Sequence, residues 1–213
     1  MTTLGILGAG RVGTALARRA VEAGYRVLIA ASGAAEDIAL IVDFAAPGAT
    51  AVTSAEAAAR ADLVVLSLPL HKYSTLDPDL FRGKIVVDAM NHWPPSDGQI
   101  GELAHAGSSS QMVQEHLRGV RVVKTLNHIG YHELETDHRS RGASDRRALA
   151  IAGDDGAARG VVGILIEGLG FDAVDAGPLA AGSAFEPGTR IFEGAFRRDE
   201  LAQMLAEPLS ARV

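Results

Sequence analysis

The sequence predicts an α/β fold with a doubly wound, mostly parallel sheet that is extended by C-terminal strands and a helical cap. Three observations predict it. An apolar run over residues 4–7 breaks into a glycine-rich turn at residues 8–13. Short apolar runs then alternate with segments of helical periodicity along the chain. The segments between the runs are long enough to carry the crossovers that parallel strands require.

The expected strands are short apolar runs, several of them continuous, as in strands that are buried on both faces. They cover residues 4–7, 25–31, 49–53, 62–68, 84–90, 120–126, 148–152 and 171–175. The expected helices lie between them and have apolar residues at helical spacing. They cover residues 12–23, 38–45, 54–61, 78–82, 111–118, 155–169 and 198–206.

Local signals mark where these helices begin and end. Start signals are a capping box, a proline after an aspartate, or a serine or aspartate cap. They stand at Thr53-x-x-Glu56, Asp77-Pro78, Ser110 and Asp154-Asp155. The stop signals are Gly24, Pro47-Gly48, Gly83 and Gly119. Three polar segments without periodicity, residues 91–110, 127–147 and 178–193, are expected to be loops.

The glycine-rich turn indicates a dinucleotide site. Gly8 allows the tight turn from strand to helix, Gly10 lets the backbone approach a pyrophosphate, and Gly13 lets the helix pack closely on the sheet. The phosphates would lie at the helix N-terminus, where free N–H groups and the helix dipole favour anions. We therefore divide the chain into a Rossmann dinucleotide-binding domain, residues 1–126, and an extension, residues 127–213, that completes the sheet and an acceptor pocket.

Composition excludes several functional classes. The chain has 213 residues, 47% hydrophobic residues and no cysteine, so redox chemistry must come from a bound cofactor. A net charge of -6 with interspersed signs argues against nucleic-acid binding. No apolar run is long enough to cross a bilayer and the N-terminus shows no signal peptide, so we expect a cytoplasmic protein. We further expect a homodimer that acts on a small redox substrate.

Five blocks, in order along nearly the whole chain, resemble those of the NADPH-dependent coenzyme F420 reductases. They are Gly8 to Gly13, Val86-Val87-Asp88, Val122-Val123-Lys124-x-x-Asn127, Ala152-Gly153-Asp154-Asp155 and Asp175-Ala176-Gly177-Pro178-Leu179. The last two blocks are the specific ones, because other Rossmann reductases share the N-terminal third. The resemblance implies that NADP(H) exchanges a hydride with a 5-deazaflavin, coenzyme F420, and that no side chain forms a covalent intermediate.

The resemblance also implies cofactor contacts at particular positions. Together with the glycine motif and the end of the second strand, the expected cofactor-binding residues are Gly8, Ala9, Gly10, Arg11, Val12, Gly13, Ala31, Ser32, Leu68, Pro69, Lys72, Asn127 and His128. Residues 127–130 correspond to a loop near the nicotinamide. The segment from Glu186 to Gly194 corresponds to the part that approaches the deazaflavin.

One departure from the family concerns the choice of nucleotide. The family carries a Ser-Arg pair for the ribose 2′-phosphate after the second strand, whereas this chain has Ala31-Ser32-Gly33 followed by Glu36 and Asp37. The strand end also lacks the acidic residue that would hold a free ribose and select NAD. Arg11 and Ser32 remain as partners for a 2′-phosphate. We therefore expect NADP, with NAD as the alternative.

Three groups of side chains could bind a metal, line the acceptor pocket or hold an anionic ligand. His128, His132 and His138 have spacings that would suit a metal, but a solvated loop bordering the nicotinamide is favoured, and no metal is expected. His71 and His92 follow strand ends, so they either line the acceptor pocket or face water. The cluster Arg139, Arg141, Arg146 and Arg147 is either a solvated loop or a site for the anionic deazaflavin tail.

Trp93 either offers a flat wall to a tricyclic ring or packs on its own prolines. No residue is predicted to be catalytic, because hydride transfer needs chiefly that two carbons be held close together in the right orientation. Two alternatives stay open. One is a reductase of another acceptor such as a flavin, imine or carbonyl, and the other is a non-catalytic dinucleotide sensor.

Overall fold

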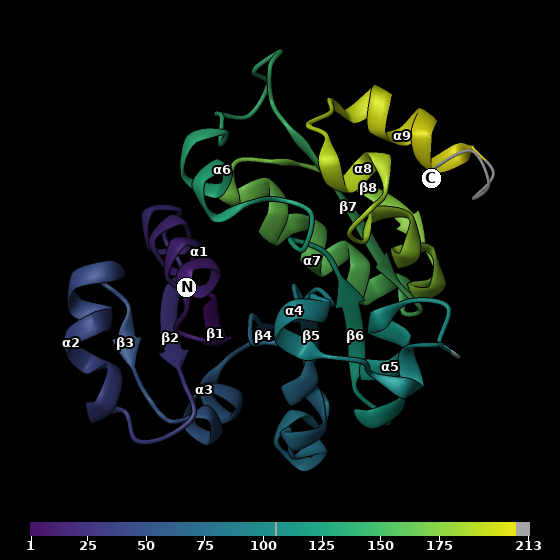
Figure 1. Cartoon of the computed structure of the whole chain (residues 1–213). Helices are drawn as coiled ribbons and strands as arrows, with labels where there is room; N and C mark the ends of the chain where they lie inside the picture. Colours follow the sequence, from purple (N-terminus) through teal and green to yellow (C-terminus); the bar gives the residue numbers. More distant parts are fainter. Residues whose placement is uncertain (105, 208–213) are drawn as a thin grey trace.

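Eight strands form one sheet in the order β3-β2-β1-β4-β5-β6-β7-β8 (Figure 1). The structure is a computed structural model that describes residues 1–104 and 106–207, and the eight strands lie within these ranges. The strands are β1 (Thr3–Leu7), β2 (Arg26–Ala30), β3 (Thr50–Ala51), β4 (Leu63–Leu66), β5 (Ile85–Asp88), β6 (Arg121–Lys124), β7 (Ala148–Gly153) and β8 (Asp172–Gly177). The predicted doubly wound sheet is confirmed, including its C-terminal extension.

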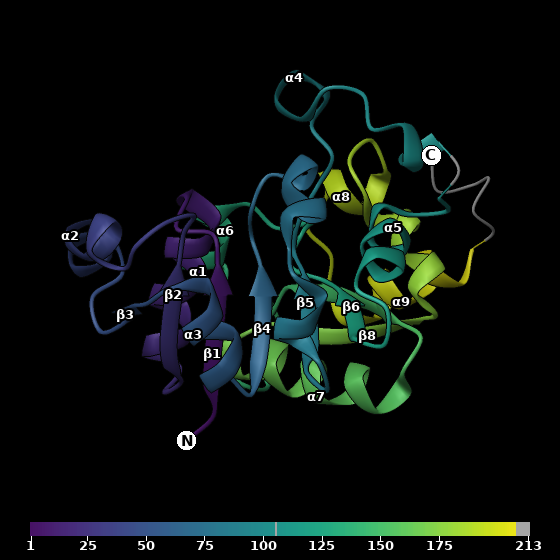
Figure 2. The ribbon, with the colours of Figure 1, turned by 90° about the horizontal axis from the view of Figure 1, so that it is seen from below.

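The sheet is covered by helices on both faces, as the alternation of side chains along each strand requires. In β1, Ile6 packs toward α1 (Arg11–Glu22), α2 (Glu36–Ala45), α6 (Tyr131–Thr136) and α7 (Gly156–Leu169). Leu7 packs toward the opposite side, with α3 (Ser54–Arg60) and α5 (Ser109–His116). The helix α9 (Arg198–Ala206) covers the end of the sheet at β7 and β8 (Figure 2). None of the helices in the described ranges has both the length and the apolar character needed to cross a membrane.

Most of the predicted helix signals act as expected. Thr53 and Glu56 form the capping box of α3, and Asp155 accepts a hydrogen bond from the backbone N–H of Ala158 at the start of α7. One prediction was wrong: α5 begins after Ser108, whose hydroxyl accepts from the N–H of Gln111, and Ser110 lies within the helix. Ser110 instead donates a hydrogen bond to the buried carboxylate of Asp88, 2.5 Å away.

The three segments expected to be loops contain short helices. Residues 91–110 contain α4 (Pro94–Asp97), the 3₁₀ helix η3 (Gly101–Ala104) and the start of α5. Residues 127–147 contain α6, and residues 178–193 contain the 3₁₀ helix η4 (Leu179–Phe185) and α8 (Arg190–Glu193). These elements are too short to give a clear periodicity in the sequence, which explains why pattern analysis missed them.

Strand β7 runs antiparallel to β6, whereas the other neighbouring pairs in the described sheet are parallel. Lys124 pairs with Ala152, so the first half of β7 extends beyond the end of β6. Residues 125–128 lie beside it, and the N–H of Ala150 donates to the imidazole of His128. The segment between β6 and β7 therefore stays at the C-terminal edge of the parallel strands, where folds of this kind bind their ligands.

Candidate functional site

The turn after β1 is held by close backbone contacts. Gly8 has φ +124, and a Cβ atom there would lie 2.3 Å from the carbonyl oxygen of Ser67. A Cβ at Gly13 would lie 1.8 Å from the carbonyl oxygen of Gly8. The hydroxyl of Ser67 donates to that same Gly8 carbonyl at 3.1 Å. The turn thus needs glycine at both positions, as the motif predicts.

Gly10 is different, because nothing lies within 4 Å of the position that its Cβ would take. Gly10 caps α1 in an extended conformation, and neither a side-chain cap nor an acidic residue occupies the first turn of the helix. The open space at Gly10 therefore adjoins the positive end of a helix dipole. This cradle fits the pyrophosphate of a dinucleotide.

A cleft of about 330 Å³ opens beside the turn. Eight of the predicted cofactor-binding residues line it, namely Gly8, Ala9, Gly10, Ala31, Ser32, Leu68, Pro69 and Lys72. Sequence reasoning did not select Ser54, Thr75 or Leu76, which line the same cleft. They come from the start of α3 and the 3₁₀ helix η1 (Leu70–Thr75), so only the sheet order brings them to the turn.

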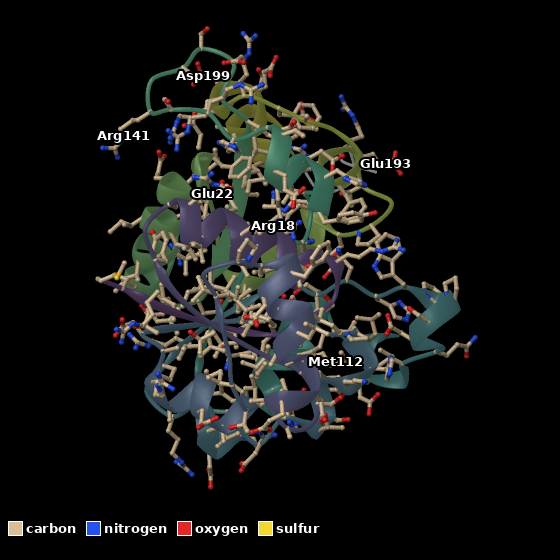
Figure 3. The ribbon with its side chains drawn as sticks, turned by 90° about the vertical axis from the view of Figure 1, so that its left-hand side faces the viewer. Arg18, Glu22, Met112, Arg141, Glu193 and Asp199 are labelled. Atoms are coloured by element: carbon tan, nitrogen blue, oxygen red, sulfur yellow. The ribbon has the colours of Figure 1, made fainter. Side chains whose placement is uncertain are left out.

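The structure places Arg11 and Gly13 outside the lining of this cleft. The guanidinium of Arg11 lies over the ring of Tyr131, 5.8 Å from its centroid, at the start of α6. Arg18 lies farther along α1 (Figure 3). It pairs with Glu135 of α6 and donates to the carbonyl of Ala45. Arg11 and Arg18 thus contact residues outside α1.

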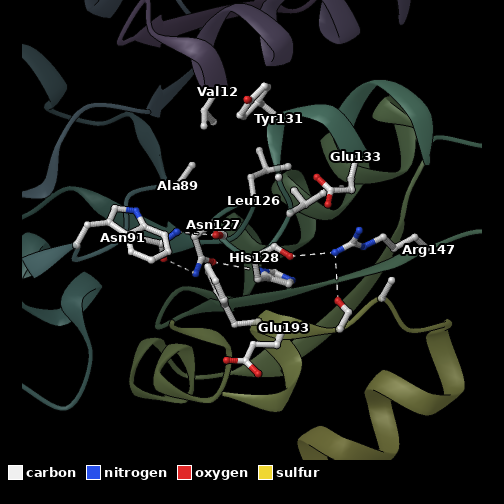
Figure 4. A pocket seen from close by; sticks show the side chains of 16 residues that line it. Val12, Ala89, Asn91, Leu126, Asn127, His128, Tyr131, Glu133, Arg147 and Glu193 are labelled. Atoms are coloured by element: carbon white, nitrogen blue, oxygen red, sulfur yellow. Dashed lines mark hydrogen bonds between the residues drawn. The ribbon is translucent and has the colours of Figure 1, made fainter. Parts of the chain in front are cut away.

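A second pocket, of about 550 Å³, begins at Val12 on the first turn of α1. It is lined by the loop after β5, the segment after β6, α6, Arg147 and the α8 segment. Val12 and Tyr131 lie on one side of this pocket and Glu193 lies on the other (Figure 4). The predicted residues Asn127 and His128 also line it. Residues at the start of α1 therefore line both clefts, Gly10 the first and Val12 the second.

Two asparagines hold the floor of the second pocket. The amide of Asn127 donates to Asn91 Oδ1 at 3.1 Å and to the carbonyl of Phe185 at 2.8 Å. Asn91 returns a hydrogen bond to the carbonyl of Asn127 at 2.6 Å (Figure 4). The adjoining Leu126 has φ +63, the only positive φ of a non-glycine residue in the described chain. Such strain is typical of segments that tertiary contacts hold in place for a functional purpose.

His128 is buried, with 3% of its surface exposed, and does not lie in the predicted solvated loop. Its Nε2 accepts from the N–H of Ala150 at 2.9 Å, which places the proton on Nδ1, where it is donated to Asn127 Oδ1 at 3.2 Å. Burial, followed by the charges of Arg147 and Lys124, lowers the pKa of His128 from 6.5 to about 3. The imidazole is neutral at physiological pH, and both of its nitrogens are already bonded.

This neutral histidine should make the stability of the fold depend on pH. Because the folded pKa is the lower one, the unfolded chain binds more protons between pH 6.5 and about 3, and stability falls as pH falls through that range. We expect His128→Gln to flatten this dependence, by up to about 1.4 kcal/mol per pH unit. Urea unfolding at several pH values measures it, with the exposed His132→Gln as control. Equal slopes in wild type and H128Q would contradict the assignment.

Next to the pocket, a buried cluster joins the ends of β5 and β6 to α5 and Glu186. The ammonium of Lys124, which is 0% exposed, donates to the hydroxyls of Ser109 at 2.9 Å and Ser110 at 3.1 Å and lies 3.3 Å from Glu186. Ser110 in turn contacts Asp88, which is fully buried. This cluster was not predicted from the sequence, because its members come from segments that lie far apart along the chain and no motif links them.

The arginine cluster divides into two parts in the structure. Arg146 is 3% exposed and pairs with Glu167 and Asp172, so this arginine does not lie in a solvated loop. Arg147 lines the second pocket, but its guanidinium pairs with Asp137 and donates to the carbonyls of His128 and Gly194. These partners leave little of Arg147 for a ligand.

Neither His71 nor His92 lines the second pocket. His71 Nδ1 lies 2.7 Å from Asp97 Oδ1, and His92 Nε2 lies 2.9 Å from the carbonyl of Gly98. Trp93 does line the pocket, is 48% exposed, and meets the ring of Phe192 edge-on with centroids 5.8 Å apart. Phe192 belongs to α8, a segment that was indicated as part of the site by the resemblance over residues 186–194 alone.

Comparison with known proteins agrees with this geometry. A hypothetical protein from Sinorhizobium meliloti, SMa0349, is 31% identical, and the match covers 93% of this chain and 97% of that one with a TM-score of 0.81. Residues 3–92 match the family described as NADP oxidoreductase, coenzyme F420-dependent. The chain belongs to this family. It is an NAD(P)-dependent oxidoreductase, and the resemblance seen in the sequence is confirmed.

Two further relatives place this oxidoreductase in a wider group. A structure from Arthrobacter sp. FB24, whose proposed role is that of an F420-dependent NADP reductase, shares the fold at 24% identity and a TM-score of 0.71, over 86% of this chain and 88% of that one. Metalloreductase STEAP3 of Rattus norvegicus is 27% identical over 186 residues, 86% of this chain. The oxidoreductase spans about a third of the length of STEAP3, 35%.

Proposed function

We propose that the protein transfers a hydride between NADP(H) and a 5-deazaflavin such as coenzyme F420. The observation that carries this proposal is that neighbouring residues at the start of α1 line both clefts: Ala9 and Gly10 line the first, and Val12 lines the second. A dinucleotide held at Gly10 can extend its nicotinamide past Val12 toward the second pocket. Bound there, NADPH supplies the hydride.

The residues of the second pocket suit a role in orientation. The polar side-chain atoms of Asn127 and His128 are bonded to each other, to Asn91 and to the backbone, and Arg147 pairs with Asp137. We infer that this wall fixes the shape of the pocket and does not exchange protons with the substrate. Catalysis would then come from holding two rings close together and excluding water.

Aromatic side chains favour a flat acceptor in this pocket. Trp93, Tyr131 and Phe192 line it from three different segments of the chain. Aromatic faces stack on planar ring systems, and the half-exposed Trp93 has room to do so. A 5-deazaflavin has such a ring system, which supports a deazaflavin as the hydride acceptor.

The decisive experiment measures kcat/KM for NADPH oxidation against a panel of a 5-deazaflavin, FMN, FAD, an imine, a carbonyl and a ferric chelate. We expect the deazaflavin to be the preferred acceptor, with a primary isotope effect from nicotinamide deuterated at the transferred position. No deazaflavin reduction, together with rapid turnover of another acceptor, would overturn the proposal. NADPH binding without turnover of any acceptor would indicate a sensor.

Trp93 gives a sharper test of the acceptor site. We expect Trp93→Ala to raise KM for the deazaflavin about tenfold, because aromatic contacts with a ligand ring contribute about 1 kcal/mol beyond the area they bury. Trp93→Phe should retain most of the affinity, and neither change should alter NADPH binding. An unchanged KM in W93A would remove Trp93 from the acceptor site.

A second candidate is a reductase of another acceptor, favoured by the likeness to the metalloreductase STEAP3. An imine or carbonyl reductase would need a proton donor near its substrate. Replacing His71, His92 or His128 should then reduce the rate by the 10²- to 10⁴-fold typical of a lost general acid or base. The bonded imidazole of His128 favours much smaller losses.

A further inference from the structure

The first cleft has a simple charge pattern. Among the described residues that line it, Lys72 is the one charged side chain, and no acidic residue is present. Lys72 lies in the last turn of η1, after β4, and is exposed. In the described chain, its ammonium group has no hydrogen bond or ion pair to another residue. The cleft therefore holds a free cation.

Two hydroxyl groups line the same cleft from the other side of β1. Ser32 follows the end of β2, and Ser54 begins α3. The Ser54 hydroxyl donates weakly to the carbonyl of Ala31 at 3.4 Å. Since β1 lies between β2 and β4 in the sheet, the two serines and Lys72 reach the cleft from strands on either side of the dinucleotide turn.

The other charged residues near the turn, one basic and one acidic, have partners elsewhere. Arg11 lies over Tyr131 and does not line the cleft. The carboxylate of Asp37 accepts a hydrogen bond from the N–H of Ala34 at 3.1 Å, and this carboxylate also does not line the cleft. Neither Arg11, which was expected from the sequence, nor Asp37 contributes its charge to the lining of the cleft.

We propose that Lys72 selects the nucleotide, by pairing with the ribose 2′-phosphate of NADP(H) while the hydroxyls of Ser32 and Ser54 donate hydrogen bonds to it. This assignment rests on the proposed binding of a dinucleotide in the first cleft. An ammonium beside a phosphate forms a charge-assisted hydrogen bond, which is stronger than a neutral one. The lysine thereby replaces the arginine that the family carries after the second strand.

The test is equilibrium binding of two probes that differ only in the 2′-phosphate, 2′,5′-ADP and 5′-AMP, by isothermal titration calorimetry. Wild type should bind 2′,5′-ADP at least tenfold more tightly than 5′-AMP. Lys72→Met should weaken 2′,5′-ADP about tenfold or more and change 5′-AMP by less than about twofold. Lys72→Arg should retain the preference, and Arg11→Met should leave it unchanged. Circular dichroism and melting temperature confirm that the variants fold.

The outcomes separate this inference from the proposed function. Equal losses of both probes in K72M would place Lys72 at the 5′-phosphate, which both probes carry, and overturn the inference. A lost preference in R11M but not in K72M would return the role to Arg11. Wild type that binds both probes equally would overturn the selection of NADP(H) while leaving the dinucleotide site intact. Binding of neither probe, nor of NADPH, would overturn the proposed function itself.

Discussion

Gly10→Val should abolish dinucleotide binding in a protein that still folds. No protein atom lies within 4 Å of the position of its Cβ, so a side chain at this position starts in open space. It would instead project into the region where a pyrophosphate meets the free N–H groups of α1. Loss of two charge-assisted hydrogen bonds at about 1.5–3 kcal/mol each weakens binding a hundredfold or more. Fluorescence titration with NADPH measures the affinity, and thermal melting measures the fold.

The matched contrast is Gly13→Val, three residues later in the same motif. Its Cβ would lie 1.8 Å from the carbonyl oxygen of Gly8, so the helix must move away from the strand. We expect this variant to lose at least about 1–3 kcal/mol of folding free energy, the usual cost of overpacking. Unchanged NADPH affinity in G10V would exclude the turn as the phosphate site.

The second large effect is expected at the buried cluster around Lys124. Lys124→Met should lower the free energy of unfolding by about 3–5 kcal/mol, because it leaves the carboxylate of Glu186 without its cation and the hydroxyls of Ser109 and Ser110 without their donor. Asp88 is fully buried, and only 21% of the Glu186 side chain is exposed. Urea unfolding monitored by circular dichroism measures the loss.

Lys84→Met is the control for this prediction. The ammonium of Lys84 donates only to the backbone carbonyls of Ala59 and Ala61, which water can reach more easily. We expect its loss to cost about 1 kcal/mol or less. A double variant, Lys124→Met with Glu186→Gln, should recover part of the stability lost in K124M. Equal effects of K124M and K84M would show that the cluster does not act as a unit.

Features that depend on contacts between sequence neighbours could be predicted from the sequence. The strand, the glycine turn and the first helix depend on contacts between neighbours, such as Gly13 against Gly8, so their residue types carry the signal. Caps at Thr53 and Asp155 are equally local. Eight of the predicted cofactor residues also lie together, for a second reason. Parallel strands place their C-terminal ends at one edge of the sheet, so the residues that follow these strands come close to one another.

The second pocket depended on the tertiary structure. The antiparallel entry of β7 brings Ala150 beside residues 125–128, and this pairing buries His128 in a segment that reads as a polar loop. Burial of Arg146 follows from its pairing with Glu167 and Asp172, which are more than twenty residues away. The periodicity of apolar residues does not indicate such contacts, because the order of the strands in the sheet decides which residues meet.

The sequence by itself determined that the chain builds a parallel sheet with a dinucleotide turn, since apolar period and glycine sterics act over a few residues. The tertiary structure decided which cation faces the dinucleotide cleft. Arg11 follows the turn directly, yet it lies over Tyr131, while Lys72 reaches the cleft from the far side of β1. The physical reason is that a long charged side chain takes its partner from the elements packed around it.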